Sequence, residues 1–178
     1  IANKRWLEIG AGVGAVLDAL SPYAGEVTAV EPQEIARNTL MELGYDVYAD
    51  IKMLPDSEYD VVTLFHVFEH LVHPIEELKL LENKMVSGGK IIIEVPHAND
   101  FLLSFLENEE FKKFTLWGEH LVLHTRNTLT RFIEEAGFIN VIIRGVQRFP
   151  LANHLHWLVK GKSGGHHKWD YLKNQDLD

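Results

Sequence analysis

A glycine-rich turn near the start of the chain holds the residues best suited to chemistry. The sequence there reads Leu7-Glu8-Ile9-Gly10-Ala11-Gly12-Val13-Gly14. A strand pattern before the turn and a helical pattern after it would bring backbone N–H groups and a helix N-terminus to the end of the strand. Glycines there let a ligand approach the main chain closely. The turn predicts a ligand site, although Gly10, Gly12 and Ala15 also satisfy the dinucleotide-binding fingerprint.

Three acidic residues follow successive strand patterns. Glu8 comes just before the first glycine, where a carboxylate would repel a pyrophosphate but suit a ligand with an ammonium and a sulfonium group. Glu31 ends the run 27–31 and suits the two hydroxyls of a ribose. Asp50 follows the third strand pattern and suits an adenine amino group. Each could be an ordinary loop acid, but the ordered set favours a ligand that contains adenosine.

A second group of polar residues follows the fourth strand pattern. His66, Glu69 and His70 are spaced i, i+3 and i+4, so they would share one face of a helical turn. Two histidines and a carboxylate could hold a divalent metal or supply a general base. The alternative is structural, with His70 bonded to the main chain and Glu69 acting as a cap. We select His66 and His70 as candidate general bases and assign no metal ligand.

Three further histidines lie near the expected pocket. His97 follows the fifth strand pattern and is expected to face the pocket, and His120 and His124 lie with Trp117 in a lid-like stretch that could contact an acceptor. A surface or core role is the simpler interpretation of each of these histidines.

Short β-rich runs alternate with amphipathic helical patterns, which is typical of a mostly parallel sheet with helices on both faces. We expect strands at 5–9, 26–30, 45–48, 59–65, 90–95 and 138–149, and helices at 15–20, 34–43, 126–136 and from residue 74 to a stop at Gly88-Gly89. Residues 99–123 are expected to form a lid, and the tail from residue 161 to be loosely structured.

Composition narrows the class of protein. The 178 residues are 46% apolar and suit a single domain, and the net charge of -9 argues against a nucleic-acid partner held by charge. The absence of cysteine excludes disulfides and thiolate chemistry. We expect a cytoplasmic protein without a membrane partner, and we leave a homodimer open. Because the first strand pattern begins so close to Ile1, we also expect a segment to precede it.

The motifs above, together with Tyr59-Asp60-Val61-Val62, Phe68-Glu69-His70-Leu71, Gly88-Gly89-Lys90 and Glu135-Ala136-Gly137-Phe138, resemble the class I S-adenosylmethionine-dependent methyltransferases. The resemblance covers most of residues 5–145 and is to small-molecule enzymes related to ubiquinone-biosynthesis O-methyltransferases and to sugar-modifying enzymes. It implies a Rossmann-like α/β fold with a seven-stranded sheet and S-adenosylmethionine as cofactor. The implied cofactor-binding residues are Glu8, Gly10, Ala11, Gly12, Gly14, Glu31, Pro32, Asp50, Ile51, Phe65 and His66.

Within that resemblance, Glu8 and the glycines would surround the methionine part, Glu31 the ribose and Asp50 the adenine. The related enzymes have an acid where this chain has His66, which argues against a Mg²⁺ site. The segment 147–166 resembles part of methyltransferases of polysaccharide and sugar biosynthesis, which implies a missing C-terminal strand, unless residues 154–159 supply it.

The predicted function is therefore methyl transfer to a small-molecule acceptor, with a sugar hydroxyl first and a small phenol or acid second. Residues 1–178 would form a single catalytic domain. One alternative is an NAD-dependent oxidoreductase, which would explain Glu31 but not Glu8, Asp50 or the Glu69-His70 pair. The other is a catalytically silent domain that binds the cofactor.

Overall fold

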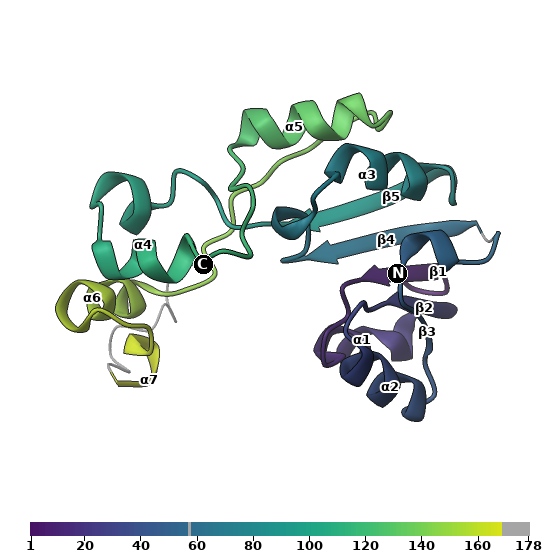
Figure 1. Cartoon of the computed structure of the whole chain (residues 1–178), viewed down its shortest axis with the longest axis horizontal. Coiled ribbons are helices and arrows are strands. Elements are labelled where there is room, and N and C mark those ends of the chain that lie inside the picture. Colours follow the sequence, from purple (N-terminus) through teal and green to yellow (C-terminus); the bar gives the residue numbers. More distant parts are fainter. Residues whose placement is uncertain (57, 169–178) are drawn as a thin grey trace.

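The computed structural model describes residues 1–56 and 58–168, and a five-stranded parallel sheet lies at its centre (Figure 1). The strands are β1 (Arg5–Ile9), β2 (Glu26–Val30), β3 (Asp46–Tyr48), β4 (Tyr59–Phe65) and β5 (Met85–Glu94), in the order β3-β2-β1-β4-β5. The chain passes from β1 to β2 and β3 on one side and then crosses to β4 and β5 on the other. The predicted α/β fold with a parallel central sheet is confirmed.

Helices cover both faces of the sheet. α1 (Ala15–Leu20) and α2 (Glu34–Glu42) lie on one face, and α3 (Pro74–Glu82) and α5 (Arg126–Glu135) lie on the other (Figure 1). Side chains alternate along β1, so that Trp6 joins the core on the α1 and α2 side and Leu7 joins the core on the α3 and α5 side. Both side chains are fully buried, as expected for a central strand covered on both faces.

Short helical turns connect these elements. η1 (Ser21–Tyr23), η2 (Ile51–Met53) and η3 (Phe68–His70) are 3₁₀ turns, and each lies shortly before or after a strand. α5 begins with a capping box in which the side chains of Thr125 and Thr128 bond each other's backbone N–H. None of the helices in the described part of the chain is long and apolar enough to cross a membrane.

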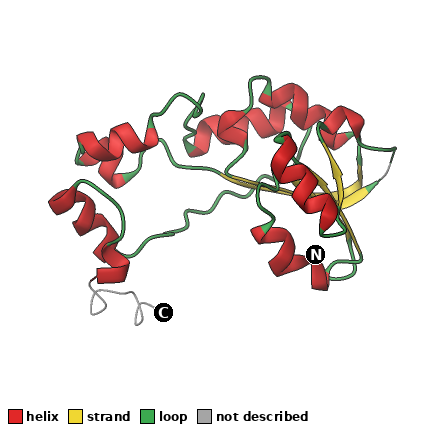
Figure 2. Cartoon of the chain, turned by 60° about the horizontal axis from the view of Figure 1, so that its bottom comes forward, coloured by secondary structure: helices red, strands yellow, loops and turns green. Residues whose placement is uncertain are grey.

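The remaining helices form a separate group. They are the π-helix η4 (Phe101–Phe105), α4 (Glu109–Thr115), α6 (Leu151–Lys160) and α7 (Gly165–Lys168). Figures 1 and 2 show α4, α6 and α7 together beyond the carboxyl ends of β4 and β5. The Trp157 ring packs against Phe111 and Phe114, with ring centroids 5.2 Å apart in both pairs. This helical group therefore stands over the edge of the sheet where ligand sites of open α/β sheets lie.

The predicted strand at 138–149 is wrong, and the described residues form five strands rather than seven. Val141 and Ile143 pack on the core while Ile139 and Ile142 are 82% and 78% exposed, and the backbone at Asn140 is left-handed (φ +58°). A strand also needs a backbone ladder with a neighbour, and the segment has none within residues 1–56 and 58–168. Alternation of apolar residues predicts an extended chain but not its pairing.

Two other boundaries differ from the sequence prediction. α3 ends at Glu82 and β5 begins at Met85. Gly88 (φ +78°) therefore does not end a helix but lies inside β5, where the pairing with β4 shifts register between Tyr59 and Val61. Residues 154–159 belong to helix α6 and supply no further strand. The four buried residues of α6 are spaced as on one helical face: Ala152, Asn153, His156 and Trp157. Of the tail from residue 161, residues 165–168 are helical and residues 169–178 lie outside the described residues.

Candidate functional site

The site lies where the direction of the sheet reverses, at the carboxyl ends of the adjacent strands β1 and β4. In open α/β sheets this reversal leaves a crevice in which ligands bind. The glycine turn leaves β1 here and the segment 65–67 leaves β4 beside it. The two loops are so close that a Cβ on Gly10 would overlap the Val67 side chain.

The three glycines of the turn all have positive φ, but their surroundings differ. Gly10, Gly12 and Gly14 have φ values of +71°, +55° and +85°. A Cβ on Gly14 would lie 2.6 Å from Leu40 Cδ2, so this glycine permits close packing of the turn on α2. A Cβ on Gly12 would meet no atom within 4 Å. Gly12 therefore faces open space and leaves its backbone accessible to a ligand.

Glu31 ties the glycine turn to the end of β2. Its Oε2 accepts a hydrogen bond from the Gly12 N–H (2.6 Å) and its Oε1 accepts one from the Gln33 N–H (2.8 Å). Arg37 donates to the carbonyl oxygens of Glu31 and Pro32, at 2.9 Å each. The carboxylate is therefore fixed at the strand ends, and each of its oxygens keeps a lone pair for a further donor.

Glu8 is a buried carboxyl at the end of a short hydrogen-bond chain. The Trp6 Nε1–H donates to Thr63 Oγ1 (2.7 Å), and the Thr63 hydroxyl in turn donates to the Glu8 carboxylate. Burial raises the pKa of Glu8 to about 7, against the opposing effect of the Thr63 bond. A nearby positive charge would favour the ionised form of this group.

The other predicted cofactor residues lie just beyond the ends of different strands or at them. Ala11 lies in the glycine turn, where its N–H donates to the Val30 carbonyl (3.2 Å), and Pro32 lies just beyond β2. Asp50 is exposed and caps η2, since its Oδ1 accepts from the Lys52 N–H (2.8 Å), while Ile51 is buried. Phe65 ends β4 and His66 follows it. The structure thus brings together the residues at the ends of β1, β2 and β4, and places Asp50 and Ile51 after β3.

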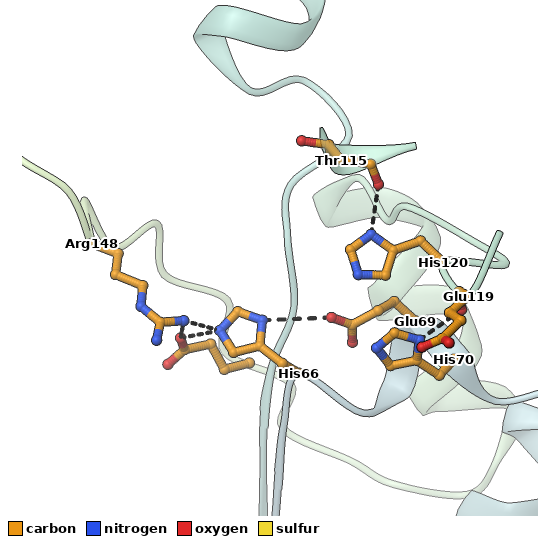
Figure 3. A network of polar contacts seen from close by, with 8 residues as sticks. His66, Glu69, His70, Thr115, Glu119, His120 and Arg148 are labelled. Carbon is orange, nitrogen blue, oxygen red and sulfur yellow. Dashed lines mark hydrogen bonds and ion pairs between the residues drawn. The ribbon is translucent and has the colours of Figure 1, made fainter. Parts of the chain in front are cut away.

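His66 occupies a strained position between charged groups. Its φ of +56° lies in the left-handed region, which residues other than glycine seldom adopt outside functional sites and tight turns. Its Nδ1 lies 3.5 Å from Glu69 Oε1 and its Nε2 lies 3.0 Å from Glu94 Oε1, while Arg148 contacts the same Nε2 (Figure 3). Glu69 raises the pKa of His66, Glu94 adds to this, and burial and Arg148 oppose it.

Glu69 lies between His66 on one side and a pair of histidines on the other (Figure 3). One ligand atom each from Glu69, His70 and His120 lie within 4.8 Å of one another. His70 Nδ1 lies 2.6 Å from the Glu119 carbonyl oxygen. His120 Nδ1 lies 2.7 Å from the Thr115 carbonyl oxygen. His66, Glu69 and His70 therefore do not form one cluster as expected. His70 lies with His120, from a distant segment, on one side of Glu69, and His66 lies on the other side.

The other histidines have different surroundings. His97 is exposed and its backbone pairs with that of His124. His124 is buried, with its ring 5.2 Å from those of Phe68 and Phe132, and burial lowers its pKa. His124 is thus a core residue rather than an acceptor contact. Trp117 lies against His120, with ring centroids 5.6 Å apart.

Several residues of the site were not predicted from the sequence: Trp6, Thr63, Glu94, Glu119 and Arg148. Each of them contacts a residue that lies far away along the chain. The separations run from 28 positions between His66 and Glu94 to 82 positions between His66 and Arg148. Only the strand pairing of β1 with β4, and of β4 with β5, brings most of them into contact.

Two cavities bear on where substrates bind. One of about 570 Å³ is lined by Arg5, Asp56, Glu58, Asn83 and Lys84, which lie at the amino ends of the strands, away from the glycine turn. The other, of about 390 Å³, begins directly after His70. Its lining is mostly apolar: Leu71, Val72, His73, Pro74, Ile75, Glu76, Leu121, Val122 and Phe132. The second cavity is the one that adjoins the candidate site.

The fold and the site together define the class. A parallel sheet with a reversal beside β1, a glycine turn that exposes its backbone, and fixed acids at the ends of β1 and β2 are features of a Rossmann-like domain that binds an adenosine-containing cofactor. The buried Glu8 suits a cofactor with positive charge, and the open space at Gly12 suits close contact with it.

Comparison with known proteins identifies the family. The model of the methyltransferase domain family matches residues 1–142. The ubiquinone biosynthesis O-methyltransferase of Aeromonas salmonicida is 28% identical over 166 residues, which cover 85% of this chain and 69% of the relative. That of Stutzerimonas stutzeri is 24% identical over 177 residues, covering 86% and 72%. The chain belongs to the methyltransferase domain family.

A solved structure agrees with this assignment. The S-adenosylmethionine-dependent methyltransferase from Archaeoglobus fulgidus superposes with a TM-score of 0.66 at 27% identity, covering 81% of this chain. The superposed part spans 65% of that chain's length. The protein is thus a class I methyltransferase and its cofactor is S-adenosylmethionine. The oxidoreductase alternative finds no support. α6 and α7 lie outside the residues that match the family model.

Proposed function

We propose that this domain transfers a methyl group from S-adenosylmethionine to a hydroxyl oxygen of a small molecule, at the crevice between β1 and β4. The observation that carries the proposal is the position of His66. Its imidazole follows β4 directly, in a loop that touches the glycine turn through Val67 and Gly10. A proton acceptor therefore stands beside the expected cofactor pocket.

The cofactor would be held by residues at three strand ends. Glu8, Gly10, Ala11, Gly12 and Gly14 would surround its methionine part. Glu31 and Pro32 would hold the ribose, Asp50 and Ile51 the adenine, and Phe65 and His66 would border the transferred methyl group. The fixed Glu31 carboxylate and the open face of Gly12 support this arrangement.

His66 is the better of the two candidate bases. When bound, S-adenosylmethionine supplies a methyl group on a positively charged sulfur, which an acceptor oxygen displaces in line. With its proton on Nδ1 facing Glu69, His66 would offer a lone pair on Nε2 to the acceptor hydroxyl proton once the acceptor displaces Glu94 and Arg148 from that nitrogen. Arg148 contacts that same Nε2 and so marks the place where a hydroxyl would donate. His70 is less suitable, because its Nδ1 is bonded to the main chain and its ring faces His120.

The acceptor we favour is a hydroxyl on an aromatic ring. The cavity beside His70 has a mostly apolar lining, which suits a ring more than a sugar with many hydroxyls. The relatives named ubiquinone biosynthesis O-methyltransferase support the same choice. The sugar hydroxyl expected from the tail remains the competing acceptor. We propose residues 1–178 as a single catalytic domain, with the helical group α4, α6 and α7 covering the site.

The test has two stages. Calorimetric titration with S-adenosylmethionine and S-adenosylhomocysteine, with NAD as control, measures cofactor binding. Radiolabel transfer to a panel of catechols, monophenols and nucleotide sugars then measures turnover. Binding of the first pair with transfer to phenols supports the proposal. Transfer to sugars alone would overturn the acceptor, and binding without transfer to any compound would favour a silent domain.

A further inference from the structure

The Glu69 carboxylate is buried without the contacts that a buried charge requires. Its side chain has no exposed area. Neither of its oxygens accepts a hydrogen bond from the described residues. Among residues 1–56 and 58–168, its one ion-pair contact is the His66 Nδ1 at 3.5 Å, which is too distant for a good hydrogen bond. Burying an ionised carboxylate in this way is costly unless a cation offsets the charge.

The two histidines beside Glu69 are held in the form that binds metals. His70 and His120 each place Nδ1 at hydrogen-bond distance from a carbonyl oxygen, of Glu119 and of Thr115. Because a carbonyl only accepts, the proton of each neutral ring must be on Nδ1. The lone pair then lies on Nε2, and a carbonyl bond of this kind is the usual outer contact of a metal-ligating histidine.

We propose that Glu69, His70 and His120 form a binding site for a divalent transition metal of the Zn²⁺ class. Two imidazoles and one carboxylate suit Zn²⁺ or Co²⁺, whereas Mg²⁺ prefers oxygen ligands throughout. At Zn²⁺ bond lengths of about 2.1 Å, tetrahedral ligand atoms are about 3.4 Å apart. The ligand atoms of the three residues lie within 4.8 Å of one another, so a bound metal would have to draw them closer together.

The backbone holds the two halves of the site together. The N–H groups of Leu121 and Val122 donate to the Glu69 carbonyl oxygen, at 2.9 and 3.3 Å. The turn η3 and the segment 115–122 are therefore joined before a metal binds, and the metal would add a further link. Three protein ligands leave a coordination position for water, on the side where His70 and His120 are half-exposed.

The site does not depend on the proposed methyl acceptor, because it rests on contacts among the protein's own groups. Sequence spacing pointed instead to His66 with Glu69 and His70. The structure assigns the third ligand to His120, which lies 50 positions beyond His70 and on a different segment.

Calorimetric titration of the untagged, chelator-treated protein with ZnCl₂, and visible absorption after addition of CoCl₂, test the proposal. We expect one equivalent to bind, and the Co²⁺ spectrum to show nitrogen and oxygen ligation. His120→Ala should weaken binding roughly 100-fold or more. Glu69→Gln should abolish binding but stabilise the metal-free protein, because it removes the buried charge. A loss of metal binding together with a gain in stability in Glu69→Gln would distinguish a metal ligand from a structural residue. This result can be measured even if His120→Ala fails to fold.

Matched controls distinguish this site from other histidines. His73→Ala removes an exposed histidine near α3 and should leave binding unchanged. His166→Ala with His167→Ala removes a pair whose rings lie 3.9 Å apart and could hold a metal on the surface. The proposal would be overturned if the double variant at His166 and His167 lost metal binding. It would also be overturned if Glu69→Gln and His120→Ala both kept metal binding. A wild-type protein that binds neither cation would overturn it as well.

Discussion

His66 Nδ1 lies 3.5 Å from Glu69 Oε1 across the turn that follows β4, and the backbone at His66 is left-handed (φ +56°). A strained backbone persists only where surrounding contacts fix it. Here Glu69 fixes one side of the imidazole and Glu94 with Arg148 fixes the other. The arrangement aligns a histidine with a buried carboxylate, as in enzymes where an acid orients a base.

His66→Asn should separate catalysis from folding. Asparagine tolerates the left-handed region, so we expect stability within about 1 kcal/mol of wild type. Loss of the proton acceptor should lower kcat by about 10²- to 10⁴-fold with little change in cofactor affinity. Radiolabel transfer and calorimetry measure the two effects, with His167→Asn, at an exposed histidine that lines neither cavity, as control. Unchanged turnover in His66→Asn would remove the proposed base.

Gly10→Ala and Gly12→Ala should fail in different ways. At Gly10 the new methyl group overlaps Val67, and we expect a loss of about 1–3 kcal/mol of stability. At Gly12 only the positive φ is unfavourable, at about 1–2 kcal/mol. Cofactor affinity should fall at Gly12 because the methyl group fills the space open to the ligand. Urea unfolding and titration with S-adenosylhomocysteine measure both. Full affinity in Gly12→Ala would contradict the placement of the cofactor.

Glu31→Gln should weaken both the turn and cofactor binding. The amide group of glutamine would turn a donor toward the N–H of Gly12 or Gln33, where the carboxylate now accepts from both. We expect a loss of about 1–3 kcal/mol of stability. Affinity for S-adenosylhomocysteine should fall at least ~10-fold, since each lost charge-assisted bond to a ribose hydroxyl is worth about 1.5–3 kcal/mol. Glu34→Gln, an exposed acid at the start of α2, is the matched control. Equal losses in both variants would argue against a ribose contact.

Glu8 should make stability depend on pH. Its pKa is raised from 4.5 to about 7, so the folded state binds more protons than the unfolded state between these values. Stability should therefore fall as pH rises from about 4.5 to 7, by at most about 3 kcal/mol. Glu8→Gln should remove this slope and be more stable than wild type at pH 8. Urea unfolding of both proteins at pH 5 and pH 8 measures the difference. An identical slope in Glu8→Gln would assign it to other groups.

The sequence was sufficient for the parts of the fold and site that depend on local pattern. Gly10, Gly12, Gly14 and Glu31 could be placed at strand ends because strand, turn and helix patterns follow one another directly. The first four strands and the four sheet-covering helices follow from apolar periodicity for the same reason.

The parts that failed depend on pairing between distant segments. Residues 138–149 have a strand's alternation but lack a partner ladder, and Gly88 lies within a strand that is held by its pairing with β4. His120 reaches Glu69 only because the backbone of residues 121 and 122 bonds to η3. Arg148 reaches His66 across 82 positions. Nothing in the local spacing of these residues specifies such contacts.

The hydrogen-bond chain from Trp6 through Thr63 to Glu8 gives the molecule an optical reporter of its own chemistry. The indole of Trp6 has no exposed area, and it is one hydroxyl group away from a carboxyl that titrates near neutral pH. When Glu8 ionises, the Thr63 hydroxyl is drawn more strongly toward it and the field at the indole changes. The emission of Trp6 should then shift with the charge on Glu8, and a cationic ligand that ionises Glu8 at pH 6 would be visible without any added label.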